Sequence, residues 1–333
     1  MVRRLSTGLG EQQWRHSVIC YRGYGTSDHI RVLARIVMRP RKAQTQLGRA
    51  TDSFLRQRGW RNFMSVPVPR AEVSVEVAGS RVEVLADANG YVDVRLRIDD
   101  LTPGLHEATI RTADGTEAKA PVQVFDGNET FGLVSDLDDT VISTMLPRLF
   151  IAAWNSFVVT EEGRRAVPGM ARMYQRMLAD HPGAPVVYVS TGAWNTYSFL
   201  NRFVERHGFP SGPMLLTDWG PTNTGWFRSG PEHKRLSLRE LARDFPNVKW
   251  VLVGDNGQHD PGLYGEFAEL QPDRVRAIAI RELSPTEQVL AHGSTTVLED
   301  VDQVTWSPDE VPTVTAPDGD SLWPLLKVVL DEG

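Results

Sequence analysis

Carboxylate side chains are crowded at two points of the sequence, each directly after an apolar run. Asp136-Leu137-Asp138-Asp139-Thr140 follows the first run, and Gly254-Asp255-Asn256-Gly257-Gln258-His259-Asp260 follows a later one. Carboxylates that converge repel one another unless a cation holds them together. Both stretches therefore indicate a site that binds a cation.

We predict that this cation is Mg²⁺, because oxygen ligands with few neutral donors favour that metal. Asp136 and Asp255 are expected to be its carboxylate ligands. The main-chain carbonyl of Asp138 would be the third ligand from the protein, and water molecules would supply the remaining ligands. Asp260 is expected to support the metal indirectly, through those ligands. Zinc is not expected, since the sequence has no cluster of His and Cys at the spacing of a zinc site.

A metal-bound carboxylate, a lysine and a strand-end hydroxyl around one point are the groups that phosphoryl transfer requires. We predict that Asp136 attacks phosphorus and becomes an aspartyl phosphate. Asp138, two residues further on, would protonate the leaving oxygen and later take a proton from the hydrolytic water. Ser190 would donate a hydrogen bond to a phosphoryl oxygen, and Lys234 would neutralise the nucleophile and the phosphate together.

Three further residues are expected to contact the substrate. Thr140 ends the first carboxylate stretch, and Thr191 and Gly192 directly follow Ser190. Thr191 is the alternative to Ser190 as a phosphate contact, because the end of a strand is uncertain by a residue when it is read from the sequence.

Each of these residues, taken alone, also has an ordinary structural interpretation. Asp-x-Asp is common in turns and calcium-like loops, and we interpret Asp139 as a turn residue or a helix cap. Ser190 alone would cap a helix, and Lys234 alone would be a surface charge. The groups occur in order, each at a predicted strand or helix end, and that combination favours the catalytic interpretation.

The surrounding residues predict strands and helices in alternation. Short, largely apolar runs predict strands covered on both faces, at 131–135, 186–189, 248–253 and 275–280. Apolar residues at helical spacing predict helices at 168–180, 196–207 and 236–245, and near the end of the chain at 322–330. This alternation predicts an α/β fold with a doubly wound parallel sheet, whose ligands bind at the carboxyl ends of the strands.

A different pattern precedes this part of the chain. From Ala71 to Phe125 apolar residues alternate with polar ones, which predicts half-buried antiparallel strands, and Asn89-Gly90 predicts a hairpin turn between two of them. We therefore predict a small all-β sandwich of immunoglobulin-like type over residues 1–127, with a helical insertion near 43–58, followed by the α/β domain over 128–333.

Charge is distributed unevenly along the chain. Residues 1–70 hold 14 Lys and Arg against 3 Asp and Glu, although the whole chain of 333 residues has a net charge of -6. A basic segment attracts anionic surfaces. Two interpretations stay open. One is peripheral contact with an anionic membrane, to which the predicted 43–58 helix could contribute. The other is an ordinary solvated face. No nucleic acid partner is expected.

Three features of the sequence predict a cytoplasmic protein, soluble or peripheral at a membrane. Cys20 is its single cysteine, which excludes an internal disulfide framework and fits a reducing compartment. The first residues lack the apolar segment of a signal peptide. No continuous apolar run reaches the roughly 18 residues of a membrane span.

Taken together, the motifs resemble those of the haloacid dehalogenase superfamily of aspartate-nucleophile phosphatases. The shared order is Asp-x-Asp-x-Thr, a strand ending in Ser/Thr, a lysine, and Gly-Asp-x-x-x-x-Asp. Within that superfamily, the sequences SDLDDTVIST, VYVSTGAWN, LLTDWG, HKR and GDNGQHDPGLYGEF resemble the catalytic domain of the actin-patch-associated phosphatidate phosphatase family, over roughly residues 130–285. The resemblance implies a three-layer fold like that of haloacid dehalogenase.

The same resemblance implies Mg²⁺-dependent removal of phosphate from phosphatidate, which yields diacylglycerol. It implies Asp136 as nucleophile, Asp138 as acid and base, Ser190 and Lys234 as phosphate contacts, and Asp255 as a metal ligand. Two alternatives stay open. One is the same mechanism on a soluble phosphate ester or a phosphoprotein, and the other is a receiver-like or non-catalytic phosphate-binding signalling module. Asp138 counts against the second, because an acid/base group beside the nucleophile promotes hydrolysis.

Overall fold

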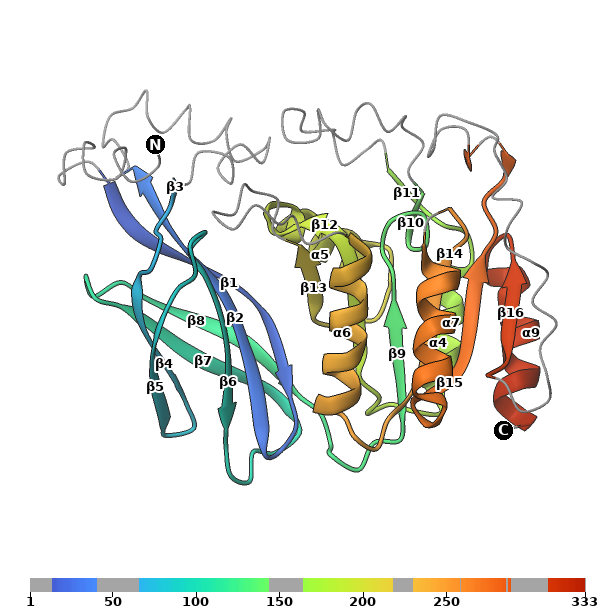
Figure 1. Cartoon of the computed structure of the whole chain (residues 1–333), viewed down its shortest axis with the longest axis horizontal. Coiled ribbons are helices and arrows are strands. Elements are labelled where there is room, and N and C mark those ends of the chain that lie inside the picture. The colour runs from blue at the N-terminus through green and yellow to red at the C-terminus, as the bar shows by residue number, and fades with distance from the viewer. Residues whose placement is uncertain are drawn as a thin grey trace. The chain divides into compact units, whose positions relative to one another are not determined.

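The described residues form two compact units, one of residues up to Asp126 and one of residues from Gly127 onward (Figure 1). The computed structural model describes residues 14–40, 66–143, 164–217, 230–257, 259–285, 287–288 and 311–332. The predicted helical insertion at 43–58 lies outside these described residues. The site residues named above all fall inside them, and all lie in the second unit.

The first unit is built from strands alone among its described residues. Its strands are β1 (Trp14–Gly25), β2 (His29–Pro40), β3 (Val66–Pro67), β4 (Glu72–Val77), β5 (Ser80–Leu85), β6 (Tyr91–Arg97), β7 (Gly104–Thr112) and β8 (Glu117–Val124). They form one sheet in the order β3-β2-β1-β8-β7-β4-β5, with β6 also paired to β2. All of these pairs are antiparallel except β1 with β8.

The alternating apolar residues of these strands form a single core. Val73 and Val75 of β4, Ile110 of β7 and Val122 of β8 are buried in one cluster with side chains of β2 and β6. Since alternate residues of a strand point to opposite faces, the alternation in the sequence is the cause of this one-sided core. The immunoglobulin-like assignment stays a prediction beside this continuous, mostly antiparallel sheet.

The hairpin predicted at Asn89-Gly90 is wrong, although a turn occurs there. Gly90 has a positive φ of 79°, and Asp87 accepts hydrogen bonds from the backbone at Asn89 and Tyr91. The flanking strands β5 and β6 pair with β4 and β2 instead of with each other. The hairpin lies between β4 and β5, where Ala78 and Gly79 both adopt positive φ (47° and 82°), as a tight two-residue turn requires.

The second unit contains a parallel sheet of six strands. They are β9 (Phe131–Ser135), β12 (Val186–Ala193), β13 (Met214–Thr217), β14 (Lys249–Asp255), β15 (Val275–Arg281) and β16 (Thr313–Ala316). Their order is β13-β12-β9-β14-β15-β16, so the first strand in the sequence lies inside the sheet. A separate pair consists of β10 (Ile142–Ser143) and β11 (Arg165–Ala166). Every pair of neighbours in the six-stranded sheet is parallel.

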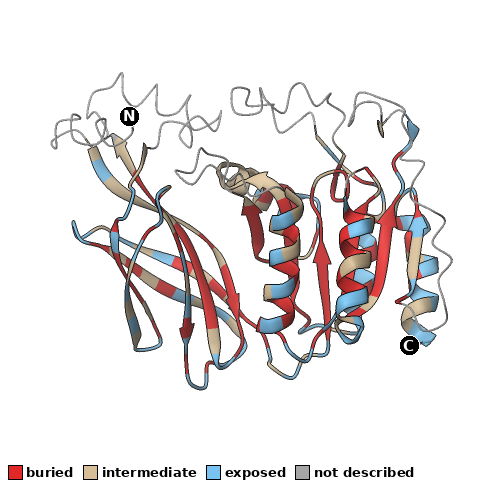
Figure 2. Ribbon diagram, in the orientation of Figure 1, coloured by how far each residue is buried: buried red, intermediate tan, exposed pale blue. Residues whose placement is uncertain are grey.

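Helices pack on this sheet. They are α4 (Met170–Ala179), α5 (Tyr197–Arg206), α6 (Gly230–Asp244), α7 (Asp260–Leu270) and α9 (Gly319–Glu332), with 3-10 turns at Trp194–Thr196 and Pro272–Arg274. Side chains of α4, α5 and α9 share one buried cluster with strand residues such as Leu133. The helices α6 and α7 lie in front of the sheet in Figure 1, and Figure 2 shows the central strands buried along their length.

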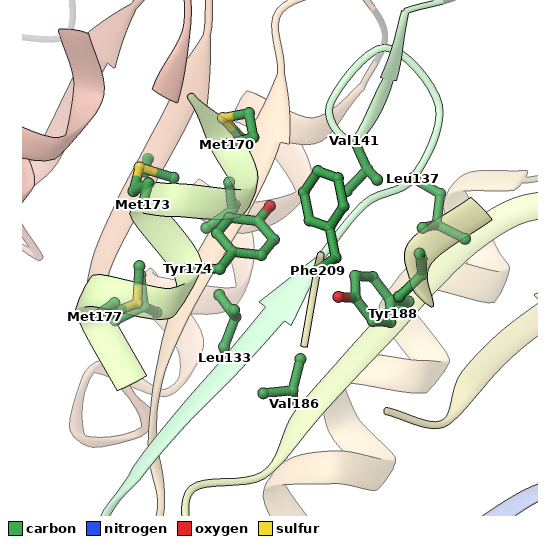
Figure 3. Close-up of a cluster of buried hydrophobic side chains, with 14 of the residues drawn as sticks. Leu133, Leu137, Val141, Met170, Met173, Tyr174, Met177, Val186, Tyr188 and Phe209 are labelled. Carbon is green, nitrogen blue, oxygen red and sulfur yellow. The ribbon is translucent and has the colours of Figure 1, made fainter. Parts of the chain in front are cut away.

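Helix α4 illustrates how the sequence produces this packing. Met170, Met173, Tyr174 and Met177 follow the i, i+3, i+4, i+7 spacing of one helix face, and all four are buried. Figure 3 shows them gathered over the strand that carries Leu133. Burying a side chain of this size contributes about 1.5–3 kcal/mol. The methionine-rich face therefore fixes α4 against the sheet.

Several elements differ from the sequence-based prediction. The predicted strands and the helices at 168–180 and 196–207 are confirmed, within a few residues, as β9, β12, β14, β15, α4 and α5. Helix α6 begins at Gly230 rather than 236, while β13, α7 and β16 were not predicted. The doubly wound assignment of haloacid dehalogenase type stays a prediction. Among the described helices, none is both long enough and apolar enough to cross a bilayer.

Candidate active site

The candidate site lies at the carboxyl ends of three neighbouring strands. Asp136 directly follows β9, Asp255 ends β14, and Ser190 lies three residues before the end of β12. Because β9 lies between β12 and β14 and all three run parallel, their carboxyl ends meet at one edge of the sheet. Ligands of open parallel sheets bind at this edge.

A buried lysine joins two of the carboxylates. The Nζ of Lys234 lies 3.2 Å from Oδ1 of Asp136 and 2.5 Å from Oδ1 of Asp260. Asp136, Asp255 and Asp260 each offer a carboxylate oxygen, and these three atoms lie within 4.8 Å of one another. All four side chains are buried, with at most 4% of any of them exposed. The carboxylates predicted from two distant stretches of sequence are therefore brought together.

Local structure explains why these groups can meet. Asp260 begins α7, directly after the β14 loop, and so points its carboxylate back toward the strand end. Gly254 makes room for it, because a Cβ at residue 254 would lie 2.5 Å from Oδ2 of Asp260 and 2.8 Å from the ring of Tyr264. Lys234 lies inside α6, one turn from its start, rather than ahead of a helix as predicted.

The loop after β9 is held by its own backbone. The N–H groups of Val141 and Ile142 both donate to the carbonyl of Leu137, at 3.0 Å each, and Asp139 donates to the carbonyl of Ile142. Asp139 has a positive φ of 55°, which suits its predicted role as a turn residue. The hydroxyl of Thr140 donates to Oδ2 of Asp255 at 3.4 Å, so this contact ties the loop to β14. Its predicted contact with substrate stays a prediction.

Ser190 is placed beside the predicted acid/base group. Its hydroxyl donates to Oδ2 of the half-buried Asp138 at 3.0 Å and accepts a hydrogen bond from the N–H of Gly192 at 2.9 Å. The methyl carbon of Thr191 faces the start of α6, since a Cβ at Gly230 would lie 2.6 Å from it. The hydroxyl proton of Ser190 is therefore shared with Asp138, and the phosphate contact predicted for Ser190, or for Thr191 as the alternative, stays a prediction.

The electrostatics of the cluster are unbalanced toward negative charge. Burial raises the pKa of Asp136 well above its ordinary value; Lys234 opposes this, and Asp260 and Asp255 add to it. Burial, followed by the charge of Asp260, raises the pKa of Asp255 to about 8. Burial lowers the pKa of Lys234, but Asp136 and Asp260 outweigh it, so that the pKa is raised overall and the lysine stays protonated.

These residues fit a divalent cation. Three buried carboxylates lie together, Lys234 pairs with only two of them, and Oδ2 of Asp260 is buried without a hydrogen-bond partner among the described residues. Carboxylate oxygens are the ligands that Mg²⁺ prefers. We predicted that Asp260 acts only through other ligands, but its oxygen lies in the same cluster as those of Asp136 and Asp255. The expected share of the Asp138 carbonyl stays a prediction.

Two arginines near the site were missed in the sequence. Arg281 ends β15, at the carboxyl end of a fourth strand, and donates to the carbonyl of Asp139. Its position directly after an apolar run was the available signal. The guanidinium of Arg164 lies 4.9 Å from the ring centre of Phe199, and burial lowers its pKa to about 10, against the opposing charges of Asp138 and Asp139. No motif pointed to Arg164.

The segment that carries all of these residues also matches a known family. Residues 131–282 match the family model described as "Phosphatidate phosphatase APP1, catalytic domain". This segment is therefore similar to an APP1 catalytic domain. From Asp136 to Arg281, each candidate site residue lies inside the matched range. The match supports a hydrolase of the phosphatase class.

Two fungal proteins show the same similarity over longer stretches. Phosphatidate phosphatase APP1 of Saccharomyces cerevisiae is 25% identical over 239 residues, which cover 66% of this chain and 39% of the yeast protein. An uncharacterized protein of Schizosaccharomyces pombe is 26% identical over 163 residues, covering 49% of this chain and 26% of its own length. The chain therefore spans well under half the length of either relative.

Solved structures show only a weak likeness to the whole chain. A carbohydrate acetylesterase from Xanthomonas citri superposes with a TM-score of 0.29 at 10% sequence identity, covering 84% of this chain and 73% of the esterase. A likeness at this level has no bearing on the fold or the function.

Proposed function

We propose that the chain is a Mg²⁺-dependent phosphatase that forms an aspartyl phosphate and hydrolyses phosphatidate to diacylglycerol and phosphate. One observation carries the proposal: Lys234 is held between Asp136 and Asp260, beside Asp255, inside a segment that matches a phosphatase catalytic domain. A carboxylate nucleophile, a fixed cation and a carboxylate cluster for metal are what this chemistry needs.

In the first step, a carboxylate oxygen of Asp136 forms a bond to phosphorus. The bond from phosphorus to the ester oxygen breaks, its electron pair stays on that oxygen, and Asp138 supplies the proton that neutralises it. The hydrogen bond from Ser190 orients the carboxyl group of Asp138 for this transfer. Lys234 remains charged throughout and offsets the negative charge of the nucleophile and the phosphoryl group.

In the second step, a water molecule attacks the aspartyl phosphate. Asp138, now a carboxylate, takes a proton from the water molecule while the water oxygen bonds to phosphorus. The bond between phosphorus and Asp136 breaks, which releases phosphate and restores the carboxylate of Asp136. Both steps use the same two residues, so the enzyme returns to its starting protonation state.

The metal would be held by Asp136, Asp255 and Asp260, whose oxygens form the cluster described above. When bound, Mg²⁺ would neutralise charge on the phosphoryl oxygens and on the carboxylates that crowd them. Without such a cation the pKa values of Asp136 and Asp255 are raised, which opposes the ionised nucleophile that the reaction requires.

The lipid substrate is proposed from the yeast relative, whose name states that it is a phosphatidate phosphatase. Such a substrate lies in a membrane surface, and the basic residues 1–70 would favour the approach to an anionic bilayer from the cytoplasm. Hydrolysis of a soluble ester by the same mechanism is the alternative outcome of the experiment below.

The test is phosphate release with Mg²⁺ from phosphatidate in mixed micelles and from a panel of soluble phosphate esters. Wild type, Asp136→Asn and a chelator-treated sample are compared. We expect the highest kcat/KM on phosphatidate, and loss of activity in the variant and with chelator. Preference for a soluble ester would reject the lipid assignment, and full activity of Asp136→Asn would reject the mechanism.

A further inference from the structure

Arg281 is a buried arginine that joins three separate segments of the second unit. Its side chain is 5% exposed. Nη1 donates to the carbonyl of Asp139 at 2.6 Å, Nε donates to the carbonyl of Pro317 at 3.1 Å, and Nη2 donates to Oε1 of Glu287 at 2.6 Å. The three partners belong to the loop after β9, the segment after β16 and the segment after β15.

The position does not require an arginine for packing. The other residues of β15 are apolar except Arg276, and an apolar residue at a sheet end would avoid the cost of burying a guanidinium. A guanidinium has donors fixed in one plane, which suits the joining of three acceptors that lie in different directions. The side chain is therefore best explained by what it holds.

The contact to Asp139 falls on the most constrained residue of the loop. Asp139 has a positive φ of 55°, which non-glycine residues adopt only where the surroundings hold them. Its carbonyl is the acceptor for Arg281, and its N–H donates to the carbonyl of Ile142. Both sides of the residue are thus fixed, one by the loop itself and one by β15.

We propose that Arg281 is a positioning residue that fixes the loop carrying Asp136 and Asp138 in its reactive geometry. The proposal rests on the function proposed above. Arg281 acts through the backbone of Asp139 and does not contact the substrate. A displacement of a reacting group by about 1 Å can lower a rate on the order of 100-fold, so this hold on the loop has a kinetic consequence.

The hold extends beyond the residues that match the family model. Pro317 and Glu287 both follow residue 282, where the match ends. The segment that contains Pro317 is itself anchored, since β16 pairs with β15 and the N–H of Gly319 donates to the carbonyl of Pro168. The segments after β15 and β16 therefore help to hold the loop after β9 in place through their contacts with Arg281.

The experiment compares Arg281→Ala with the matched control Arg276→Ala. Arg276 lies on the same strand and donates to the carbonyl of Leu330, so it supports α9 without touching the loop. We expect Arg281→Ala to lower kcat by about 10- to 100-fold with KM nearly unchanged, and added guanidinium ion to restore part of it. Arg276→Ala should keep wild-type kcat.

Two results would overturn the proposal. One is a kcat of folded Arg281→Ala close to wild type. The other is an equal loss in both variants, which would indicate support of the fold alone.

A second measurement tests the same contact without activity. Amide hydrogen exchange at Asp139, Val141 and Ile142 should become faster in Arg281→Lys, and in Arg281→Ala where it folds, while the control leaves it unchanged. Unchanged exchange at all three amides rejects the positioning role. Inactive wild type on every ester would instead reject the proposed function, and the exchange result would still decide the role of Arg281.

Discussion

A buried cation in each unit, Arg31 in the first and Lys234 in the second, has carboxylate partners in different numbers. In the first, the guanidinium of Arg31 faces both oxygens of one carboxylate, that of Asp93, at 2.8 and 2.6 Å, and its remaining nitrogen donates to the hydroxyl of Tyr24. In the second, the buried Lys234 pairs with two carboxylates, those of Asp136 and Asp260, and a third, that of Asp255, lies in the same buried cluster. One arrangement is electrically balanced and the other is not.

This difference separates a structural ion pair from a site. A balanced pair with its hydrogen bonds made needs nothing further, and its role ends with the fold. An excess of buried negative charge is costly unless a cation offsets it, and burial, followed by the charge of Asp260, raises the pKa of Asp255 to about 8. The imbalance, more than the presence of charge, marks the second unit as the reactive one.

The largest expected effect is a difference in kcat between two Asp→Asn variants, one in each unit. Asp136→Asn removes the proposed nucleophile and should lower kcat about 1000-fold or more. Asp93→Asn removes a carboxylate from the balanced pair and should leave kcat unchanged. Initial rates of phosphate release measure both. A comparable loss in Asp93→Asn would break the contrast between the units.

Metal binding should reverse the effect of removing one carboxylate from the cluster. Without Mg²⁺, Asp255→Asn should be more stable than wild type, because it relieves like-charge repulsion. With Mg²⁺ at about 100 times its Kd, wild type should gain about 2.7 kcal/mol and the variant much less, so their order inverts. Thermal unfolding with and without the metal measures this. Parallel shifts of both proteins would show that the cluster is not the binding site.

The balanced pair should matter for stability instead. Asp93→Asn keeps one acceptor for Arg31 but loses the charge, and we expect a loss of about 1–2 kcal/mol in the free energy of unfolding. The ion pair is only partly buried, since 44% of the Asp93 side chain is exposed, which limits the effect. Urea unfolding measures it, and an increase in stability would contradict a structural role for the pair.

The smallest effect concerns a turn of the first unit and depends on pH. Partial burial raises the pKa of Asp114, but hydrogen bonds from Thr112 and Thr116 outweigh it and lower the pKa to about 2. A lowered pKa stabilises the fold above the unfolded value near 4, and this contribution disappears as pH falls toward 2.

Asp114→Asn should therefore be less stable than wild type at pH 6, by under about 1 kcal/mol because the side chain is partly exposed. The difference should shrink at pH 3. Urea midpoints of both proteins at the two pH values measure it, and a gap that widens on acidification would contradict the assignment.

Prediction from the sequence succeeded best where the residues adjacent in the sequence decide the local structure. The strand runs of β9 and β14 are largely apolar, so both strands and the aspartates at their ends could be located. Helix α7 was missed because Asp260-Pro261-Gly262 reads as a turn, although proline is well tolerated in the first turn of a helix. Strand β16, with the short sequence TVTA at the sheet edge, gives almost no apolar signal.

Contacts between distant segments could not be predicted in the same way. The roles proposed for Asp136 and Lys234 were predicted from motif order, but the direct contact of Lys234 with Asp260 depends on where α6 and α7 pack. The carbonyl of Asp139 lies 142 residues from Arg281 along the chain, and no local pattern in the sequence records such a contact. Packing of separate elements decides these details.

The position of β9 inside the sheet also affects how the protein is made. This strand leaves the ribosome first among the six, yet its two neighbours, β12 and β14, begin 55 and 118 residues after its first residue. A nascent chain that ends before β14 exposes an unpaired strand edge beside the loop that carries Asp136, which favours aggregation or chaperone binding. Under the role proposed for Arg281, the loop after β9 is held in place only late in synthesis, once Arg281 and the segment after β16 have emerged.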